Sequence, residues 1–319
     1  MASSLRFREV TRRFGEVLAL DRLTLEVTPG QVVALLGSSG SGKTTALRLV
    51  NRLLEPGSGE VWLDDLEIGR CDPILLRRRI GYVIQEGGLF PHWTARDNVA
   101  LVPRLCGWPE ERVLRRVGEA MELAQIPVGQ FGKRYPSSLS GGQRQRVAFA
   151  RAVAGQPDLL LLDEPFGALD PVTRDTLHGE FRAWHAGLGT TTVLVTHDVV
   201  EAFKLADRIA VLHHGRLLQV GPPVELVLRP AHPQVSHLLG PSSLELRLRF
   251  LTLDQVLPEL PSAPGLPAVE LDGSSTLAEG LEAMARERCE ALVVRRSGAT
   301  PAGPVSRSDL WSLLRCSTS

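Results

Sequence analysis

A phosphate-binding pattern constrains the fold of this 319-residue chain more than any other feature. Gly37-Ser-Ser-Gly-Ser-Gly-Lys43-Thr44 matches G-x-x-x-x-G-K-[ST], and it lies between an apolar strand, Val32–Leu36, and a helical pattern, Thr44–Leu54. In that context the glycines let backbone N–H groups turn toward phosphate oxygens, and the helix N-terminus adds its dipole. We expect Lys43 to contact the β- and γ-phosphates of a nucleotide, and the Thr44 hydroxyl to bind Mg²⁺. The predicted nucleotide contacts are Gly37, Ser38, Ser39, Gly40, Ser41, Gly42, Lys43, Thr44 and Thr45.

A second apolar segment ends in two carboxylates. Leu159–Leu162 lacks polar alternation, as expected of a strand covered on both faces, and Asp163 and Glu164 follow it. Beside a phosphate loop, Asp163 is placed to bind Mg²⁺, and Glu164 to orient or deprotonate an attacking water. Taken alone, the segment could equally be a strand followed by solvated acids. Together the two motifs predict a P-loop NTPase.

The composition argues against several other classes of protein. Lys+Arg and Asp+Glu both number 36, so the formal net charge is zero and nothing indicates binding to nucleic acid or to an anionic membrane surface. The four cysteines are scattered without metal-ligand spacing, which indicates free thiols in a reducing compartment. No apolar run approaches the roughly 20 residues needed to cross a bilayer. If the chain serves a membrane, we expect it to do so through a partner.

The pattern of elements changes twice along the chain. Short strands and turns fill the first quarter, and helical patterns dominate residues 94–154. Buried strands and a hairpin follow, up to Val220. Gly240-Pro-Ser-Ser is typical of a hinge, and a proline-rich stretch comes after it. We therefore predict a domain boundary near residue 240, which separates residues 1–240 from a linker and small domain at 241–319.

Five further motifs resemble those of the ATP-binding cassette (ABC) ATPases and follow the order of that family. They are Phe14 in Arg13-Phe14-Gly15, Gln85 at the end of a strand, Leu139-Ser140-Gly141-Gly142-Gln143, Ala168-Leu169-Asp170, and His197 in Thr196-His197-Asp198. The Leu-Ser-Gly-Gly-Gln motif is specific to the family, and the resemblance covers about residues 4–240. Taken alone, Phe14 could be an ordinary core aromatic and His197 a core or surface histidine.

The resemblance implies the fold, the cofactors and the roles of the site residues. It implies an α/β fold of the P-loop NTPase cassette type: a mixed-sheet core, an N-terminal antiparallel β subdomain, and a helical subdomain at about residues 90–156. ATP and Mg²⁺ are the implied cofactors. Glu164, His197 and Gln85 are the implied catalytic residues. The implied metal ligands are Thr44, Gln85 and Asp163, and the implied nucleotide contacts outside the phosphate loop are Phe14, Ser140, Gly141, Gly142, Gln143 and Asp170.

The Ser140-Gly141-Gly142 segment implies a second copy of the chain. Its backbone N–H groups at a helix start form a second anion site, although a helix N-cap explains the same residues locally. In the ABC family this site faces the γ-phosphate that the other cassette holds. Both halves of the composite site follow the family pattern, so we expect a two-fold homodimer with two ATP molecules between the copies.

Segments around the phosphate loop resemble the ATPase subunits of bacterial osmoprotectant importers, which transport glycine betaine, choline or proline. The similar segments are Leu47–Pro56, Asp72–Gln85, Gly88–His92 and Asp97–Pro103. This resemblance implies transmembrane permease subunits as direct partners, a solute-binding protein as an indirect one, and no nucleic acid. It implies a peripheral location on the cytoplasmic face of the cell membrane.

Other functions remain compatible with parts of the pattern. An import ATPase for another solute, such as an amino acid or polyamine, would share most of these motifs. A soluble cassette acting on DNA or ribosomes would predict coiled-coil arms, zinc-ligand cysteines or a second cassette, and the sequence has none of these. An ATP sensor that does not hydrolyse is disfavoured by the intact Glu164 and His197.

Residues 243–319 resemble one CBS (cystathionine β-synthase-type) unit. Leu277, Leu281 and Met284 share one helix face, which could contact a second copy or pack within its own unit. Ser306 and Asp309 match a [ST]-x-x-D motif that can hold a nucleotide ribose, or they form an ordinary helix N-cap. The family usually has two such units per chain and this sequence has one clear copy. We therefore expect the unit to pair with a second copy in a dimer.

Overall fold

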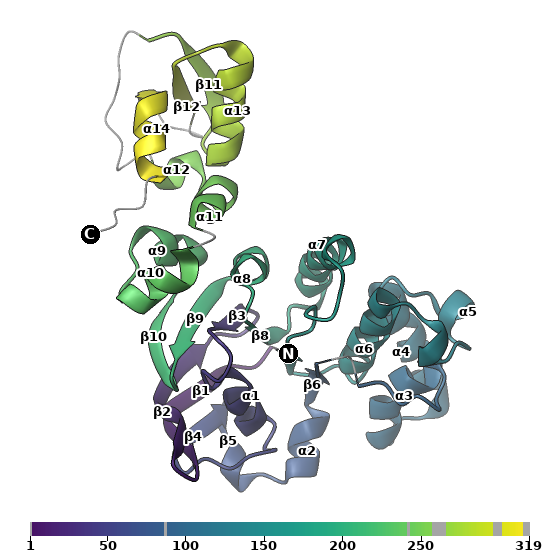
Figure 1. Cartoon of the computed structure of the whole chain (residues 1–319). Coiled ribbons are helices and arrows are strands. Elements are labelled where there is room, and N and C mark those ends of the chain that lie inside the picture. The colour runs from purple at the N-terminus through teal and green to yellow at the C-terminus, as the bar shows by residue number, and fades with distance from the viewer. Residues whose placement is uncertain (1, 86–87, 241–242, 257–265, 296–301, 315–319) are drawn as a thin grey trace. The chain divides into compact units, whose positions relative to one another are not determined.

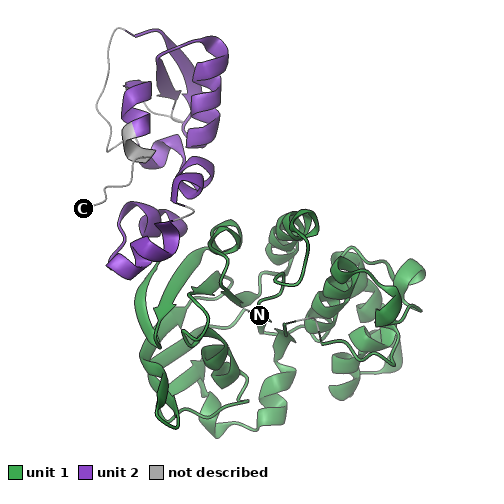
Figure 2. Cartoon of the chain, in the orientation of Figure 1, with its two compact units in different colours: residues 1–222 green, residues 223–319 purple. Residues whose placement is uncertain are grey.

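The computed structural model describes residues 2–85, 88–240, 243–256, 266–295 and 302–314. The chain divides into two compact units, Met1–Pro222 and Pro223–Ser319 (Figure 2). The division lies earlier than the predicted boundary near residue 240, because helices α9 (Pro223–Leu228) and α10 (Pro233–Leu239) group with α11 (Ser243–Phe250). Arg247 of α11 donates a hydrogen bond to the carbonyl oxygen of Val227 in α9 at 3.4 Å.

The first unit contains an antiparallel sheet with the strand order β2-β1-β4-β5, as expected for the N-terminal β subdomain. Leu5 pairs with Val27 on one side and with Leu63 on the other, and all three side chains are buried. Alternate residues of these strands therefore form one wall of the core. The strands are β1 (Leu5–Phe14), β2 (Val17–Val27), β4 (Ser58–Leu63) and β5 (Leu66–Glu67).

The second sheet of this unit has six strands in the order β10-β9-β3-β8-β7-β6. Strands β9, β3, β8, β7 and β6 run parallel, and β10 pairs antiparallel with β9. All residues of β3, β7 and β8 are buried, which explains the apolar runs Val32–Leu36, Leu159–Leu162 and Val193–Val195 within them. The strands are β3 (Val32–Leu36), β6 (Ile80–Val83), β7 (Leu159–Asp163), β8 (Thr191–Thr196), β9 (Arg208–His213) and β10 (Arg216–Gly221).

Helices of the first unit fall into two groups (Figure 1). Near the strands are α1 (Lys43–Val50), α2 (Pro73–Arg78), α7 (Pro171–Leu188), α8 (Val199–Leu205) and the 3₁₀ turn η1 (Ile68–Arg70). The predicted helical subdomain contains α3 (Ala95–Leu105), α4 (Glu110–Leu123), α5 (Val128–Phe131), η2 (Pro136–Ser138) and α6 (Gly141–Ala154). Both α3 and α4 pack on α6, so the signature motif at the start of α6 belongs to this group.

The second unit contains a three-stranded sheet with the order β11-β12-β13. Leu277 and Met284 of α13 are buried, and Gly280 lies next to Leu292 and Leu253 of the same unit. The apolar face of α13 is therefore covered within its own unit. Its elements after α11 are α12 (Leu253–Val256), β11 (Ala268–Asp272), α13 (Leu277–Glu287), β12 (Ala291–Arg295), β13 (Ala302–Ser306) and α14 (Arg307–Leu314).

Ser306 caps helix α14. Its hydroxyl accepts a hydrogen bond from the backbone N–H of Asp309 at 3.2 Å and donates one to the Asp309 carboxylate at 2.5 Å. This is the N-cap alternative for the [ST]-x-x-D motif. Among the described residues, no helix is long and apolar enough to cross a membrane.

Candidate active site

Four neighbouring parallel strands end at the same edge of the six-stranded sheet. In spatial order these are β3, β8, β7 and β6, and each leads directly into one of the predicted motifs. Open α/β sheets bind ligands at the carboxyl ends of their strands. The motifs that follow are the phosphate loop, His197, the Asp163–Glu164 pair and Gln85, respectively.

Close backbone approaches shape the phosphate loop. A Cβ atom on Gly42 would lie 2.4 Å from the carbonyl oxygen of Ala19, and Gly42 has a φ of 101°, so both space and backbone conformation require glycine there. A Cβ atom on Gly37 would lie 2.2 Å from the carbonyl oxygen of Leu212. Helix α1 begins at Lys43 with no side chain capping its N-terminus. Its first N–H groups can therefore bind an anion.

Lys43 is buried beneath this loop. Its Nζ donates hydrogen bonds to the carbonyl oxygens of Gly37 and Ser38, both at 2.8 Å. Burial lowers the pKa of Lys43, and the nearby carboxylates of Glu164 and Asp163 oppose that shift. The ammonium group is thus held by neutral carbonyl groups, which phosphate oxygens can replace.

Asp163 and Thr44 form a compact set of oxygen ligands. The Thr44 hydroxyl donates to Asp163 Oδ1 at 3.2 Å, and the Tyr82 hydroxyl donates to Asp163 Oδ2 at 3.4 Å. Burial raises the pKa of Asp163, so a nearby divalent cation would stabilise its charged form. A hydroxyl and a carboxylate are hard donors that suit Mg²⁺ when phosphates complete its shell. The residues therefore fit the metal.

The Glu164 side chain contacts both Gln85 and His197. Its Oε2 accepts a hydrogen bond from Gln85 Nε2 at 3.4 Å and lies 3.2 Å from His197 Nδ1. The backbone of Glu164 has a φ of 46°, an unfavourable conformation for a residue with a side chain. A hydrogen bond from its N–H to the carbonyl oxygen of Val195 in β8 stabilises this conformation. Glu164 therefore contacts both of the other proposed catalytic side chains.

Three other predicted contacts lie outside this cluster. In the part of the chain that the structure describes, no hydrogen bond or ion pair joins Ser140, Asp170 or Phe14 to it. Ser140 caps α6 in a reciprocal capping box with Gln143. Asp170 caps α7 by accepting from the N–H of Thr173 at 3.0 Å, and Phe14 packs against the Arg12 guanidinium.

Gly141 and Gly142 lie near the first turn of α6. Gly141 lines an open groove together with Glu164. A Cβ atom on Gly142 would lie 2.7 Å from Thr173 Cγ2, so the start of α6 packs closely against α7. Of the remaining phosphate-loop residues, Ser38, Ser39 and Gly40 are exposed and Ser41 is buried, and Thr45 is half-buried in α1.

Tyr82 belongs to this site although no sequence motif marks it. Burial and the charge of Asp163 raise its pKa to about 12, so its hydroxyl stays protonated and donates to Asp163. The available signal was its position in β6, which pairs in parallel with β7 and places Tyr82 opposite Leu161.

Comparison with known proteins gives the family. Residues 20–167 match the ABC transporter family. The glycine betaine/carnitine/choline transport ATP-binding protein OpuCA of Bacillus subtilis (strain 168) is 38% identical over 329 aligned residues, which cover 97% of this chain and 84% of that protein. The chain belongs to the ABC transporter family. It is an ATP-binding ATPase of that family, as the motifs predicted.

Two further relatives of this ABC ATPase differ in how much of the chain they match. The sulfate/thiosulfate import ATP-binding protein CysA of Synechococcus elongatus is 45% identical over 240 residues, 75% of this chain and 69% of that protein. A solved dimeric structure of the ATP-binding cassette MJ0796, in a post-hydrolysis state bound to ADP and Pi, has a TM-score of 0.61. It is 33% identical and covers 68% of this chain and 98% of that one.

Proposed function

We propose that this ABC ATPase powers the import of a compatible solute such as glycine betaine, choline or proline. The supporting observation is the extent of the similarity. The glycine betaine/carnitine/choline relative matches 97% of the chain, whereas the sulfate/thiosulfate relative matches 75%. Both relatives match the cassette, and only the glycine betaine/carnitine/choline relative also matches most of the remaining chain. This additional similarity favours an osmoprotectant importer over an importer of another amino acid or a polyamine.

The side chains at the strand ends support a division of roles in ATP hydrolysis. Glu164 orients or deprotonates the attacking water, with Gln85 and His197 holding its carboxylate in place. Lys43 contacts the β- and γ-phosphates. Thr44, Asp163 and Gln85 would hold Mg²⁺, which would neutralise the charge of the phosphates.

A second copy of the chain completes each site in this proposal. Ser140 and Asp170 lie outside the phosphate-loop cluster. Ser140 is the N-cap of α6, and a helix N-terminus can bind an anion. The related cassette MJ0796 forms a dimer with ADP and Pi bound. We infer that two copies bind two ATP molecules between them, each copy contributing the phosphate loop of one site and the signature motif of the other.

Permease docking is proposed at the loop between β6 and α3: the sequence predicts the segment Gln85–His92, and the structure adds the neighbouring Trp93. Residues 86–87 of this segment lie outside the described residues. Phe90 and Trp93 are exposed by 46% and 40%, and their ring centroids are 4.8 Å apart. The fully buried Asn98 side chain donates to three carbonyl oxygens of this loop, those of Phe90, Trp93 and Thr94, and accepts from the Phe90 N–H. An exposed aromatic pair whose backbone is held by Asn98 fits an apolar helix of a partner. Such docking would place the chain peripherally on the cytoplasmic face of the membrane.

Cysteine crosslinking tests this docking. In a background without native cysteines, Phe90→Cys and Trp93→Cys should each form disulfides with a cytoplasmic loop of the permease that also carries a cysteine. Leu114→Cys is the matched control, because Leu114 is equally exposed but lies on α4. Equal crosslinking from Leu114→Cys, or crosslinks only to nucleic acid or ribosomal proteins, would rule the surface out.

Reconstituted transport tests the solute class. The chain, its neighbouring permease and the solute-binding protein should take up glycine betaine, choline or proline into proteoliposomes when ATP is enclosed with the ATPase. A complex with Glu164→Gln provides the background rate. ATP-dependent uptake of only another amino acid, a polyamine or sulfate would contradict the proposed class.

The C-terminal unit is proposed to regulate transport. Its sequence resembles one CBS unit, its described residues contain helices and a three-stranded sheet, and its Ser306 hydroxyl caps α14. That engagement favours a response to ionic strength over binding of a nucleotide ribose. In the same proteoliposomes, deletion of residues 243–319 should preserve uptake at one ionic strength and abolish its dependence on ionic strength. Identical salt responses of both chains would make this unit a passive appendage.

A further inference from the structure

A buried histidine outside the ATP site touches two segments that carry proposed catalytic residues. His178 of α7 is 4% exposed. Its ring packs edge-on against Phe166, with centroids 4.9 Å apart, and its Nε2 lies 3.8 Å from Glu201 Oε2. Phe166 belongs to the loop that starts at Glu164, and Glu201 belongs to α8, which begins just after His197.

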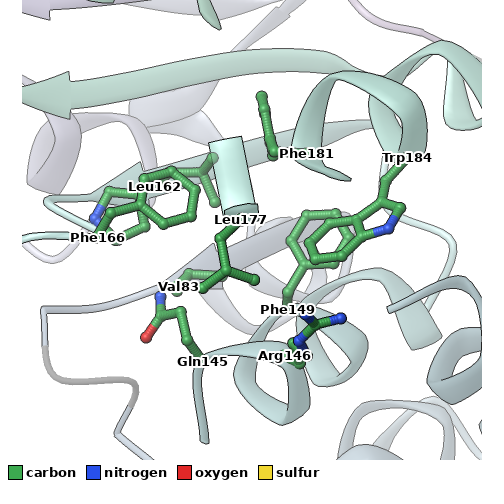
Figure 3. Close-up of a pocket in the computed structure, with 10 residues that line it drawn as sticks. Val83, Gln145, Arg146, Phe149, Leu162, Phe166, Leu177, Phe181 and Trp184 are labelled. Atoms are coloured by element: carbon green, nitrogen blue, oxygen red, sulfur yellow. The ribbon is translucent and has the colours of Figure 1, made fainter. Parts of the chain in front are cut away.

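The Phe166 side of this contact is firmly packed. Phe166 also contacts Phe181 of α7, with centroids 6.3 Å apart. Figure 3 shows both rings around a small apolar pocket, with Phe149 and Trp184 on its other side. A displacement of α7 at His178 would therefore act on Phe166 and on the loop that follows Glu164, because the two rings are in direct contact.

On the Glu201 side of this contact, two ion pairs join α7 to α8 and its N-cap. Arg174 Nη1 lies 3.6 Å from Asp198 Oδ2, and Lys204 Nζ lies 2.8 Å from Asp175 Oδ1. Asp198 in turn caps α8 by accepting from the N–H of Glu201 at 3.1 Å. On α7 both ion pairs start from the turn just before His178, and on the α8 side their partners come before and after Glu201. His178 and Glu201 form the buried centre of this contact.

Several polar atoms at this buried centre have no hydrogen-bond partner among the described residues. Among the described residues, neither ring nitrogen of His178 has a hydrogen-bond partner, and neither has Glu201 Oε1. Burial raises the pKa of Glu201, and the neighbouring His178 is the main group that opposes this shift; Asp198 adds to the shift and Arg174 opposes it. Asp175 Oδ1 lies 4.0 Å from His178 Nδ1. Buried polar groups without partners cost stability, so a residue that only fills the core would be apolar here. A role in the neighbouring site accounts for the histidine better.

We propose that His178 is a positioning residue for ATP hydrolysis: wedged between Phe166 and Glu201, it sets the separation of Glu164 from His197. Those two side chains lie 3.2 Å apart, so a small change in the spacing of their segments alters the geometry around the attacking water. The inference rests on the proposed catalytic roles of Glu164 and His197.

Steady-state ATP hydrolysis by the full chain tests the proposal. His178→Gln should lower kcat by about tenfold and leave KM for ATP within about twofold, because misplacement affects the transition state more than ATP binding. Glu201→Gln should act in the same direction and carries the test if His178→Gln does not fold. His185→Gln is the matched control. His185 is a half-buried histidine of α7 whose Nε2–H donates to the carbonyl oxygen of Thr190 at 2.7 Å, and His185→Gln should keep wild-type kcat.

A coupling measurement separates positioning from packing. In a His197→Ala background, single-turnover hydrolysis should fall by less than about threefold on adding His178→Gln, because residues that act as a unit are not additive. Wild-type kcat in folded His178→Gln and Glu201→Gln, or a full tenfold further loss in the His197→Ala background, overturns the proposal. Wild-type turnover in Glu164→Gln would instead overturn the assignment of the site itself.

Discussion

Glu164→Gln should nearly abolish steady-state ATP hydrolysis and leave ATP binding intact. Glutamine preserves the size of the side chain and its contacts with Gln85 and His197, but it cannot accept a proton from water. General-base catalysis contributes about 10²–10⁴-fold, so a loss of that size in kcat is expected. Equilibrium ATP binding should stay within a few-fold of wild type, and ATP should trap the dimer in size-exclusion chromatography.

A matched control isolates the position of the carboxylate. Glu180 of α7 pairs with Arg146 at 2.7 Å, and neither residue is among the side chains that contact Glu164. Glu180→Gln should retain wild-type turnover. Turnover by Glu164→Gln within about threefold of wild type would show that another group activates the water.

Lys43→Ala should lower both ATP binding and turnover by at least about 100-fold. The substitution removes the only cation that contacts the loop carbonyls of Gly37 and Ser38 among the described residues, and with it the charge that phosphates would meet. In a partly buried site of low dielectric, losing a charge-assisted contact costs several-fold more than at the surface. Titration with a fluorescent ATP analogue and a phosphate-release assay measure the two effects.

Lys133→Ala is the control for Lys43, because Lys133 is exposed in the helical subdomain. Its affinity and turnover should match those of wild type. If Lys43→Ala also binds and hydrolyses ATP normally, Gly37–Thr44 is not the phosphate site.

Local sequence predicted the residues at the strand ends well. The apolar runs before Gly37 and Asp163 are β3 and β7, and their parallel pairing through β8 brings Lys43, Glu164 and His197 together. Such segments carry their own signals, because fully buried parallel strands need unbroken apolar residues. The predicted helix Thr44–Leu54 was too long, since α1 ends at Val50 and Arg52 takes a φ of 53°.

Contacts between distant segments were not predictable in this way. Tyr82 reaches Asp163 only because β6 pairs with β7, and His178 meets Glu201 only because α7 packs on α8. No periodicity in the sequence indicates which polar side chain faces which. The division after Pro222 was not predictable from local sequence either, because it depends on α9 packing with α11.

The buried Asn98 amide has a mechanical consequence. The Asn98 side chain donates three hydrogen bonds and accepts one, and these bonds hold the backbone of Phe90, Trp93 and Thr94 rigidly to α3, which contains Asn98. A stiff surface transmits a displacement to whatever is pressed against it, whereas a compliant one absorbs part of the motion. If Phe90 and Trp93 contact a permease, little of the movement generated at the ATP site would be dissipated at this joint.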